Sequence, residues 1–126
     1  MTLASSDRIA RERSGRRAET LARWYLALKG FRLLARRLRT PAGEIDLVVA
    51  RGALLVFVEV KLRPSLDEAC AALTPMAQSR LANAARAASA RFPEQQWRDR
   101  RFDVLALAPG RWPRHIVNAL ALGDRP

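Results

Sequence analysis

Two acids and an amine on two neighbouring apolar runs of this chain could do chemistry together. Asp46 lies in the run at residues 45–50, and Glu59 and Lys61 close the run that starts at residue 53 or 54. Because side chains alternate between the faces of a strand, Glu59 and Lys61 share one face. The alternative is a strand end that emerges into solvent, where these two residues form a surface ion pair of little energetic weight.

The turn between the two runs decides whether the acids meet. A type II′ turn needs glycine at its first central position, which selects residues 52–53 as the loop of a hairpin. This register places Asp46 opposite Glu59, with their Cβ atoms ~5 Å apart, and Glu44 opposite Lys61. Carboxylates that close repel each other unless a proton or a cation lies between them. The register therefore predicts a site for a hard divalent cation, with Mg2+ as the natural candidate.

Two other loops stay open. With residues 51–52 as the loop, Asp46 would face Phe57, and Glu59 would be diagonal to it on the same face. A three-residue loop would place Asp46 and Glu59 on opposite faces and would remove the site.

The elements that must position these residues follow from hydrophobic periodicity and turn residues. An apolar stripe predicts an amphipathic helix from Arg16 to Lys29 that Gly30 ends. Thr74 and Pro75 open a second helix that runs to about Arg91 and buries small alanines. Strands are expected at residues 31–39, 45–50, 53–61, 101–108 and 115–120. The order αβββαββ predicts an α/β domain with a mixed central sheet at residues 15–121, followed by a tail (122–126). Residues 1–14 are expected to form a flexible basic arm or a frayed lead-in to the first helix.

Composition narrows the class of partner. The chain has 126 residues and a net charge of +11, which favours a polyanion such as nucleic acid, although a basic surface typical of an arginine-rich proteome would look the same. Only two basic residues are lysines, Lys29 and Lys61. The single cysteine, Cys70, excludes an internal disulfide and fits a reducing, cytoplasmic location. No apolar run approaches the ~20 residues that span a bilayer, so no membrane partner is expected.

Several short motifs resemble those of one family. They are GEIDL at residues 43–47, FVEVKLR at 57–63, RFD at 101–103 and GRRAE at 15–19. In this combination they resemble the YraN family of small, largely uncharacterised bacterial proteins. That family is expected to share the PD-(D/E)xK fold of restriction endonucleases and archaeal Holliday-junction resolvases. The resemblance implies a restriction-endonuclease-like αβββαβ core whose mixed sheet is flanked by helices.

The resemblance also implies roles for matched positions. Asp46 and Glu59 would bind Mg2+ or Mn2+, with the backbone carbonyl of Val60 as a third ligand. Lys61 would orient the attacking water and help to deprotonate it. Glu19 matches an acid that completes such sites through water, although an i,i+4 pair with Arg23 is the alternative. Glu44 fits only a paired role beside Lys61.

Three positions depart from the family pattern. Ala77 stands where relatives often carry a lysine, which weakens the expected phosphate contact, although Arg80 lies one turn further on. Arg37 stands where asparagine is common, and Leu120 where an aromatic residue is usual. The arginines expected to contact phosphates are Arg39, Arg63 and Arg80.

Other conspicuous residues are expected to be structural. Arg101 is predicted to pair with Asp103 while Phe102 fills the core, and His115, the only histidine, is predicted to be an ordinary strand residue. Tryptophans at 24, 97 and 112 could stack bases, but packing is favoured for each.

These features together predict a metal-dependent nuclease that hydrolyses phosphodiester bonds in structured DNA. The alternative is a non-catalytic nucleic-acid-binding module on a nuclease fold that acts with a partner. A third possibility is an interaction protein with a basic surface, which would show no salt-dependent binding of nucleic acid. Because resolvases of this fold act as dimers, a homodimer is expected.

Overall fold

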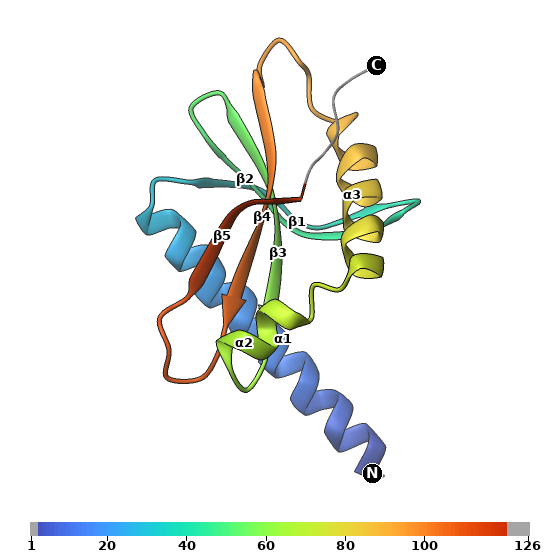
Figure 1. Cartoon of the computed structure of the whole chain (residues 1–126), viewed down its shortest axis with the longest axis vertical. Helices are drawn as coiled ribbons and strands as arrows, with labels where there is room; N and C mark the ends of the chain where they lie inside the picture. The colour runs from blue at the N-terminus through green and yellow to red at the C-terminus, as the bar shows by residue number, and fades with distance from the viewer. Residues whose placement is uncertain (1–2, 121–126) are drawn as a thin grey trace.

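A computed structural model of the chain describes the backbone of residues 3–120 and the side chains of residues 15–120 (Figure 1). Its helices and strands follow one another in the order α1 (Leu3–Leu28), β1 (Arg32–Thr40), β2 (Gly43–Arg51), β3 (Leu54–Leu62), α2 (Leu66–Ala71), α3 (Pro75–Ser89), β4 (Asp99–Leu107) and β5 (Arg114–Leu120). The expected α/β class with the αβββαβ order is confirmed. In the described part of the chain, no helix is long and apolar enough to cross a membrane.

The five strands form one mixed sheet in the order β1-β2-β3-β4-β5. Neighbouring strands are antiparallel except β3 and β4, which are parallel. A parallel pair needs a crossover connection, and α2 and α3 supply it. β3 is the central strand of the five. Its residues 55–59 are buried, so both faces of the strand are covered there, and burial decreases towards its carboxyl end.

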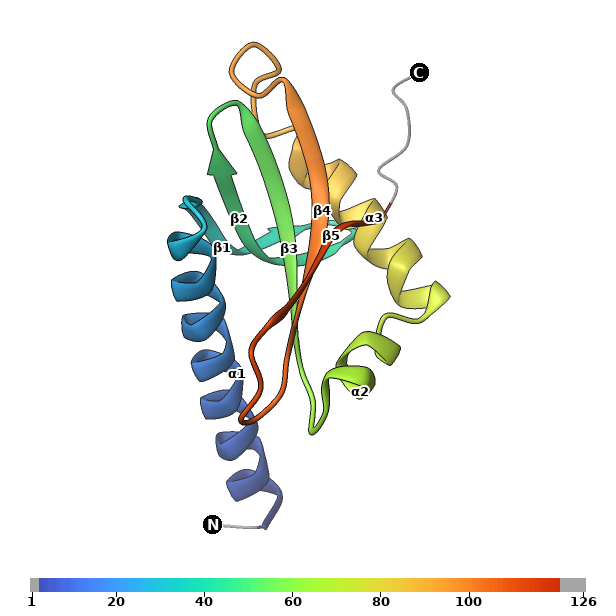
Figure 2. The ribbon, with the colours of Figure 1, turned by 60° about the vertical axis from the view of Figure 1, so that its left-hand side comes forward.

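Each face of the sheet carries its own apolar core, and Figure 2 shows α1 and α3 on opposite sides of the strands. On one face Ala22 and Leu26 of α1 pack against Val56 and Val58 of β3. On the other face the buried alanines of α3 pack against Phe57 of β3 and its neighbours. Small side chains let α3 lie close to the sheet, as the sequence predicted. All five positions predicted for its buried face are buried: Ala77, Leu81, Ala84, Ala85 and Ala88.

The hairpin between β2 and β3 has the register on which the predicted site depends. Gly52 has a φ of 60°, whereas Ala53 is not among the residues with positive φ, as a type II′ turn requires. Arg51 pairs with Leu54, and the ladder continues to Leu47 and Val58. The two alternative loops are therefore excluded.

Two segments differ from the sequence-based expectation. α1 begins at Leu3 rather than near Arg16, so residues 3–14 continue the helix, which agrees with a lead-in to the first helix, one of the two expectations for this segment. The sequence predicted no helix or strand between the strand at 53–61 and the helix that Thr74 opens, yet α2 lies there. It forms because the Ser65 hydroxyl accepts a hydrogen bond from the Glu68 backbone N–H and caps it. The predicted tail at residues 122–126 lies outside the described residues, and the division into arm, domain and tail stays a prediction.

Candidate metal centre

The candidate site lies where the pairing of β2 and β3 ends. Asp46 and Glu59 are the next opposed positions after Leu47 and Val58, the last pair of the ladder. The backbone N–H of Val60 donates to Oδ2 of Asp46 at 2.8 Å, so a side chain occupies a place that a strand partner would take. The acid is thereby fixed between the two separating strands.

Glu59 is a buried acid beside a second acid. Its exposed fraction is 8%, and its side chain shares a hydrogen bond with that of Asp46. Burial, this hydrogen bond and the charge of Asp46 raise the pKa of Glu59 from 4.5 to about 9. Glu59 therefore keeps its proton near neutral pH in the metal-free chain and donates it towards Asp46.

Two cations on the same face act in the opposite direction. Nζ of Lys61 lies 3.7 Å from Oε2 of Glu59, and both side chains are largely buried. The positive charges of Lys61 and of Arg80 on α3 favour the ionised form of Glu59, but burial and Asp46 outweigh them. Asp46, Glu59, Lys61 and Arg80 thus form one electrostatic cluster, contributed by β2, β3 and α3.

An open cavity of about 820 Å3 gives access to Asp46 from the α1 side of the sheet. Glu19 of α1 lines it, together with Val60 and Asp46. Arginines from α1, from β1 and from the segment that follows β3 line it: Arg16, Arg37, Arg39 and Arg63. Such a cavity attracts anions towards Asp46, whereas Glu59 and Lys61 are not among its lining residues.

The structure corrects the expected partners of two acids. Glu44 lies opposite Arg39 of β1, 3.6 Å from its Nε, and not beside Lys61. Glu19 accepts a hydrogen bond from Nε of Arg37 at 3.1 Å, in place of the i,i+4 pair with Arg23. β1 supplies both arginines, and both line the cavity.

Arg37 has a φ of 50°, a left-handed conformation that is uncommon outside glycine. Asparagine tolerates this conformation better than arginine, which is a physical reason for the asparagine that the family pattern leads us to expect here. Here the longer side chain reaches Glu19 instead.

Comparison with known sequences identifies the family. Residues 18–107 match the model of the uncharacterised protein family UPF0102. A UPF0102 protein of Parvibaculum lavamentivorans is 54% identical over 88% of this chain and 84% of its own length. A UPF0102 protein of Bradyrhizobium diazoefficiens is 48% identical over 93% of this chain and 88% of its own length. A UPF0102 protein of Nitrobacter winogradskyi is 50% identical over 89% of this chain and 95% of its own length. The chain belongs to family UPF0102. The expected membership of the YraN family, which is the same family, is confirmed.

In this UPF0102 protein, the groups that could hold a metal are the carboxylates of Asp46 and Glu59 and the main chain at Val60. Three or more His, Cys, Asp or Glu side chains do not gather anywhere among the described residues. Mg2+ keeps several waters and commonly uses one or two protein carboxylates, so Asp46 and Glu59 fit it. The raised pKa of Glu59 supports this fit, because a cation between the acids would replace the shared proton.

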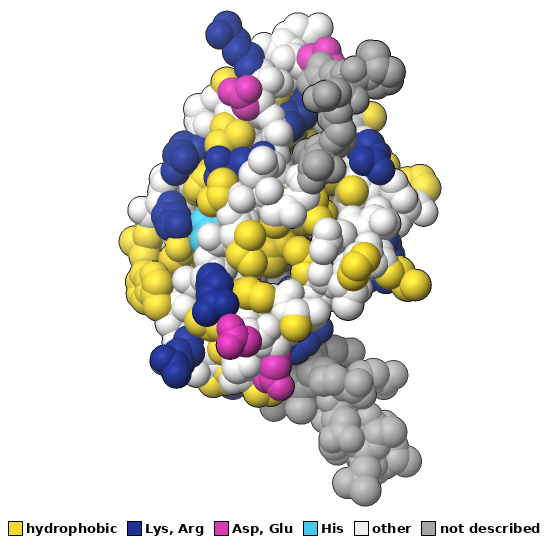
Figure 3. Space-filling model, viewed as in Figure 1, with side chains coloured by type: hydrophobic (Ala, Val, Ile, Leu, Met, Phe, Trp, Pro, Cys, Tyr) yellow, Lys and Arg dark blue, Asp and Glu magenta, His cyan; other side chains and the backbone are white. Residues whose placement is uncertain are grey.

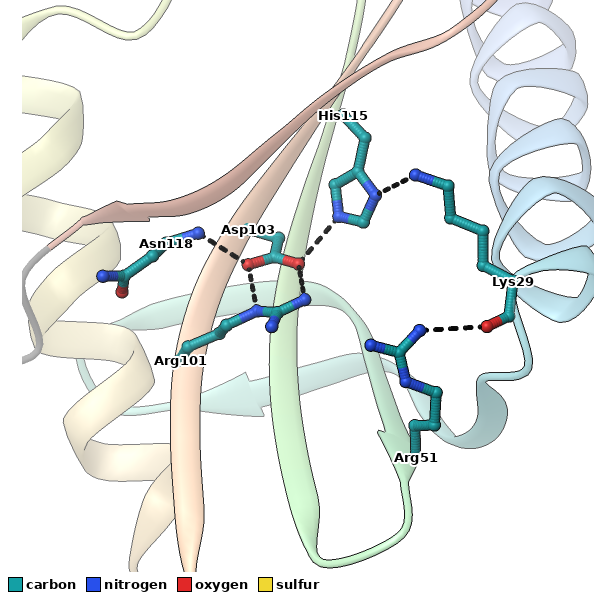
Figure 4. Close-up of polar contacts among 6 residues, drawn as sticks. All are labelled: Lys29, Arg51, Arg101, Asp103, His115 and Asn118. Carbon is teal, nitrogen blue, oxygen red and sulfur yellow. Dashed lines mark hydrogen bonds and ion pairs between the residues drawn. The ribbon is translucent and has the colours of Figure 1, made fainter.

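A second buried acid of this UPF0102 protein lies on the adjacent strand (Figure 4). Asp103 accepts two hydrogen bonds from Arg101, at 2.9 and 3.0 Å, as predicted. It also lies 2.7 Å from Nε2 of His115 and accepts from the Asn118 backbone N–H at 2.9 Å. Burial would raise the pKa of Asp103, but these hydrogen bonds together outweigh it and lower the pKa below 3.8.

His115 lies in β5, as expected, but its side chain belongs to a buried polar network that the sequence did not predict. Its side chain is 4% exposed, and its Nδ1 lies 3.1 Å from Nζ of Lys29. Because an ammonium can only donate, Nδ1 accepts and Nε2 carries the proton that His115 donates to Asp103. The lysine in an arginine-rich chain, together with the lone histidine, was the available signal for this network.

The three tryptophans of this UPF0102 protein differ in environment. Trp97 is buried at 3% exposure, so the packing expected for it is confirmed. Trp24 and Trp112 are 68% and 74% exposed, and the packing expected for them is wrong.

Proposed function

We propose that this protein is a nuclease that hydrolyses phosphodiester bonds in DNA with Mg2+ or Mn2+. Asp46 and Glu59 hold the cation, with the Val60 carbonyl as a third ligand. The observation that carries the proposal is the pair of carboxylates that share a proton beside an arginine-lined cavity. A purely structural role would favour neutralised acids, as Asp103 is.

The chain's own side chains have distinct tasks in this proposal. A bound divalent cation polarises the phosphate and lowers the pKa of a coordinated water molecule. Lys61, held beside Glu59, orients the attacking water and assists its deprotonation. Arg39, Arg63 and Arg80 bind the phosphates on either side of the scissile bond, which makes binding strongly dependent on salt. Glu19 lies across the cavity and acts through water.

Cleavage of a panel of labelled DNA substrates tests the proposal. Duplex, single-stranded, flap and junction DNA are incubated with Mg2+ or Mn2+, or with EDTA. We expect metal-dependent cleavage that Glu59→Ala and Asp46→Ala abolish. Glu68→Gln, which removes an exposed acid of α2 outside the cavity, is the matched control and should retain activity.

Titration calorimetry with Mg2+ separates the two readings of a negative result. If the wild type binds metal and DNA but cleaves no substrate, the nuclease is contradicted. The alternative, a nucleic-acid-binding module that acts with a partner nuclease, then stands, and Ala77 in place of a lysine accords with it. Activity unchanged by Asp46→Ala and Lys61→Ala would also contradict the proposal. The homodimer and the cytoplasmic location stay predictions.

A further inference from the structure

A second groove continues from the arginine-lined cavity along α1. It encloses about 670 Å3 between α1 and the loop that joins β4 to β5. Figure 2 shows this loop beside α1 at the lower end of the sheet. Ala18 and Leu62 line both the groove and the cavity, so the two are contiguous. A ligand bound at the candidate metal centre can therefore extend into the groove along the surface.

This groove presents large apolar side chains that neither core uses. Trp24 of α1 and Trp112 of the β4–β5 loop are mostly exposed, and Leu21 and Leu28 are more than half exposed. The rings of Trp112 and of the buried Tyr25 pack in a T-shaped arrangement, with centroids 5.9 Å apart and planes at 71°. Contiguous exposed apolar residues, with two indoles among them, mark a binding surface rather than a solvated face.

The charge at the groove favours an anion. Arg17 and Arg111 are its charged lining residues, and among the described residues no acid lines it. Figure 3 shows Lys and Arg side chains beside the hydrophobic side chains at the left-hand edge of the molecule. A surface of flat rings and arginines suits an anionic ligand that itself has flat rings better than it suits an apolar segment of a protein.

We infer that the groove binds unpaired nucleotides, whose bases stack on Trp24 and Trp112 while Arg17 and Arg111 contact the phosphates. This inference rests on the proposed nuclease function and adds the class of substrate. Bases of an intact duplex are stacked on one another and cannot reach the indoles without flipping out. The substrate is therefore a strand that is unpaired next to the scissile phosphate, as at a flap, a gap or an open junction.

Binding of a fluorescent oligothymidylate, measured by anisotropy in EDTA, tests the inference independently of cleavage. Oligothymidylate forms no duplex with itself, so its binding reports on unpaired nucleotides. We expect Trp24→Ala and Trp112→Ala each to weaken its affinity about tenfold, because base–aromatic stacking contributes on this scale. Trp112→Phe should restore most of the affinity. Val117→Ala, another exposed apolar side chain that does not line the groove, should have no effect.

A duplex of the same charge distinguishes stacking from general attraction. We expect the tryptophan variants to leave duplex affinity within about twofold of the wild type, and Arg98→Ala, a basic residue remote from the groove, to weaken neither ligand. Unchanged oligothymidylate affinity in both tryptophan variants would overturn the inference. Tryptophan variants that change the sedimentation coefficient of the protein but not its affinity for oligothymidylate would also overturn the inference. Such a result would show that a second copy of the chain covers the groove. Cleavage lost in Glu59→Ala has no bearing on this result, so the two proposals fail separately.

Discussion

Two buried carboxylates on adjacent parallel strands have opposite fates. Glu59 of β3 and Asp103 of β4 are 8% and 0% exposed, and burial penalises the ionised form of both. Asp103 receives hydrogen bonds from Arg101, His115 and a backbone N–H, and its pKa falls. Glu59 is buried with a second acid as its hydrogen-bond partner, and its pKa rises to about 9.

The difference lies in partners and not in burial. On the α1 side of β4 the fold supplies enough hydrogen-bond donors to neutralise Asp103. The deficit of such donors at Glu59 is therefore not a general property of this sheet. Structures tend to leave such a deficit where a ligand compensates for it. The comparison therefore separates a carboxylate that holds the fold together from one that is kept ready for a cation.

The largest effect is expected from removal of the neutralised acid. Asp103→Ala leaves Arg101, His115 and the Asn118 backbone N–H without their shared acceptor. We expect the free energy of unfolding to fall by about 3–5 kcal/mol, as is typical when one partner of a buried charge network is lost. Urea unfolding measures it, with Asp103→Asn as the milder variant. A loss below about 1 kcal/mol in Asp103→Ala would remove the contrast between the two acids.

The two acids should also give opposite pH dependence in the metal-free protein. Because the folded pKa of Glu59 exceeds 4.5, the folded chain holds a proton that the unfolded chain releases, so stability falls as the pH rises from about 4.5 to about 9. The folded pKa of Asp103 lies below 3.8, so its contribution is present above that pH and is lost as the pH falls through the folded value.

Glu59→Gln separates these two branches. In EDTA at pH 8 we expect it to raise the free energy of unfolding by about 2 kcal/mol, because it removes a proton-binding group whose ionisation is disfavoured in the fold. The fall in stability towards alkaline pH should flatten, while the acid branch should persist. Urea unfolding across the pH range measures both. An unchanged alkaline branch would mean that Glu59 is not the titrating group.

The smallest effect is expected from an arginine–aspartate pair that is exposed to solvent, in contrast to the buried pair of Arg101 and Asp103. Arg114 lies 3.3 Å from Asp67, whose side chain is 95% exposed. Asp67→Asn should leave the free energy of unfolding unchanged within the error of the measurement, because solvent screens the pair. The same urea measurement checks it. A loss as large as that of Asp103→Ala would show that burial is not what distinguishes these acids.

The sequence was sufficient for the local geometry of the hairpin and of α3. Gly52 determined the turn, the turn determined the register, and the register placed Asp46 opposite Glu59. It was not sufficient for contacts between distant segments. Lys29 and His115 are 86 positions apart, and nothing in either segment alone indicates that they meet. The helical stripe that buries Ala22 and Leu26 of α1 likewise gives no sign of which segment lies beside the exposed Trp24. The structure places a loop from near the other end of the chain there.

The turn at Gly52 also has a consequence for how such sites change over time. The turn determines the pairing register, because residues lie opposite each other across the hairpin only when they are equally far from the turn along the chain. One residue gained or lost in the loop would carry Asp46 and Glu59 to opposite faces and leave every letter of both motifs unchanged. The length of this loop is therefore as much a part of the site as the acids, and a search by motif alone would accept chains in which the site no longer exists.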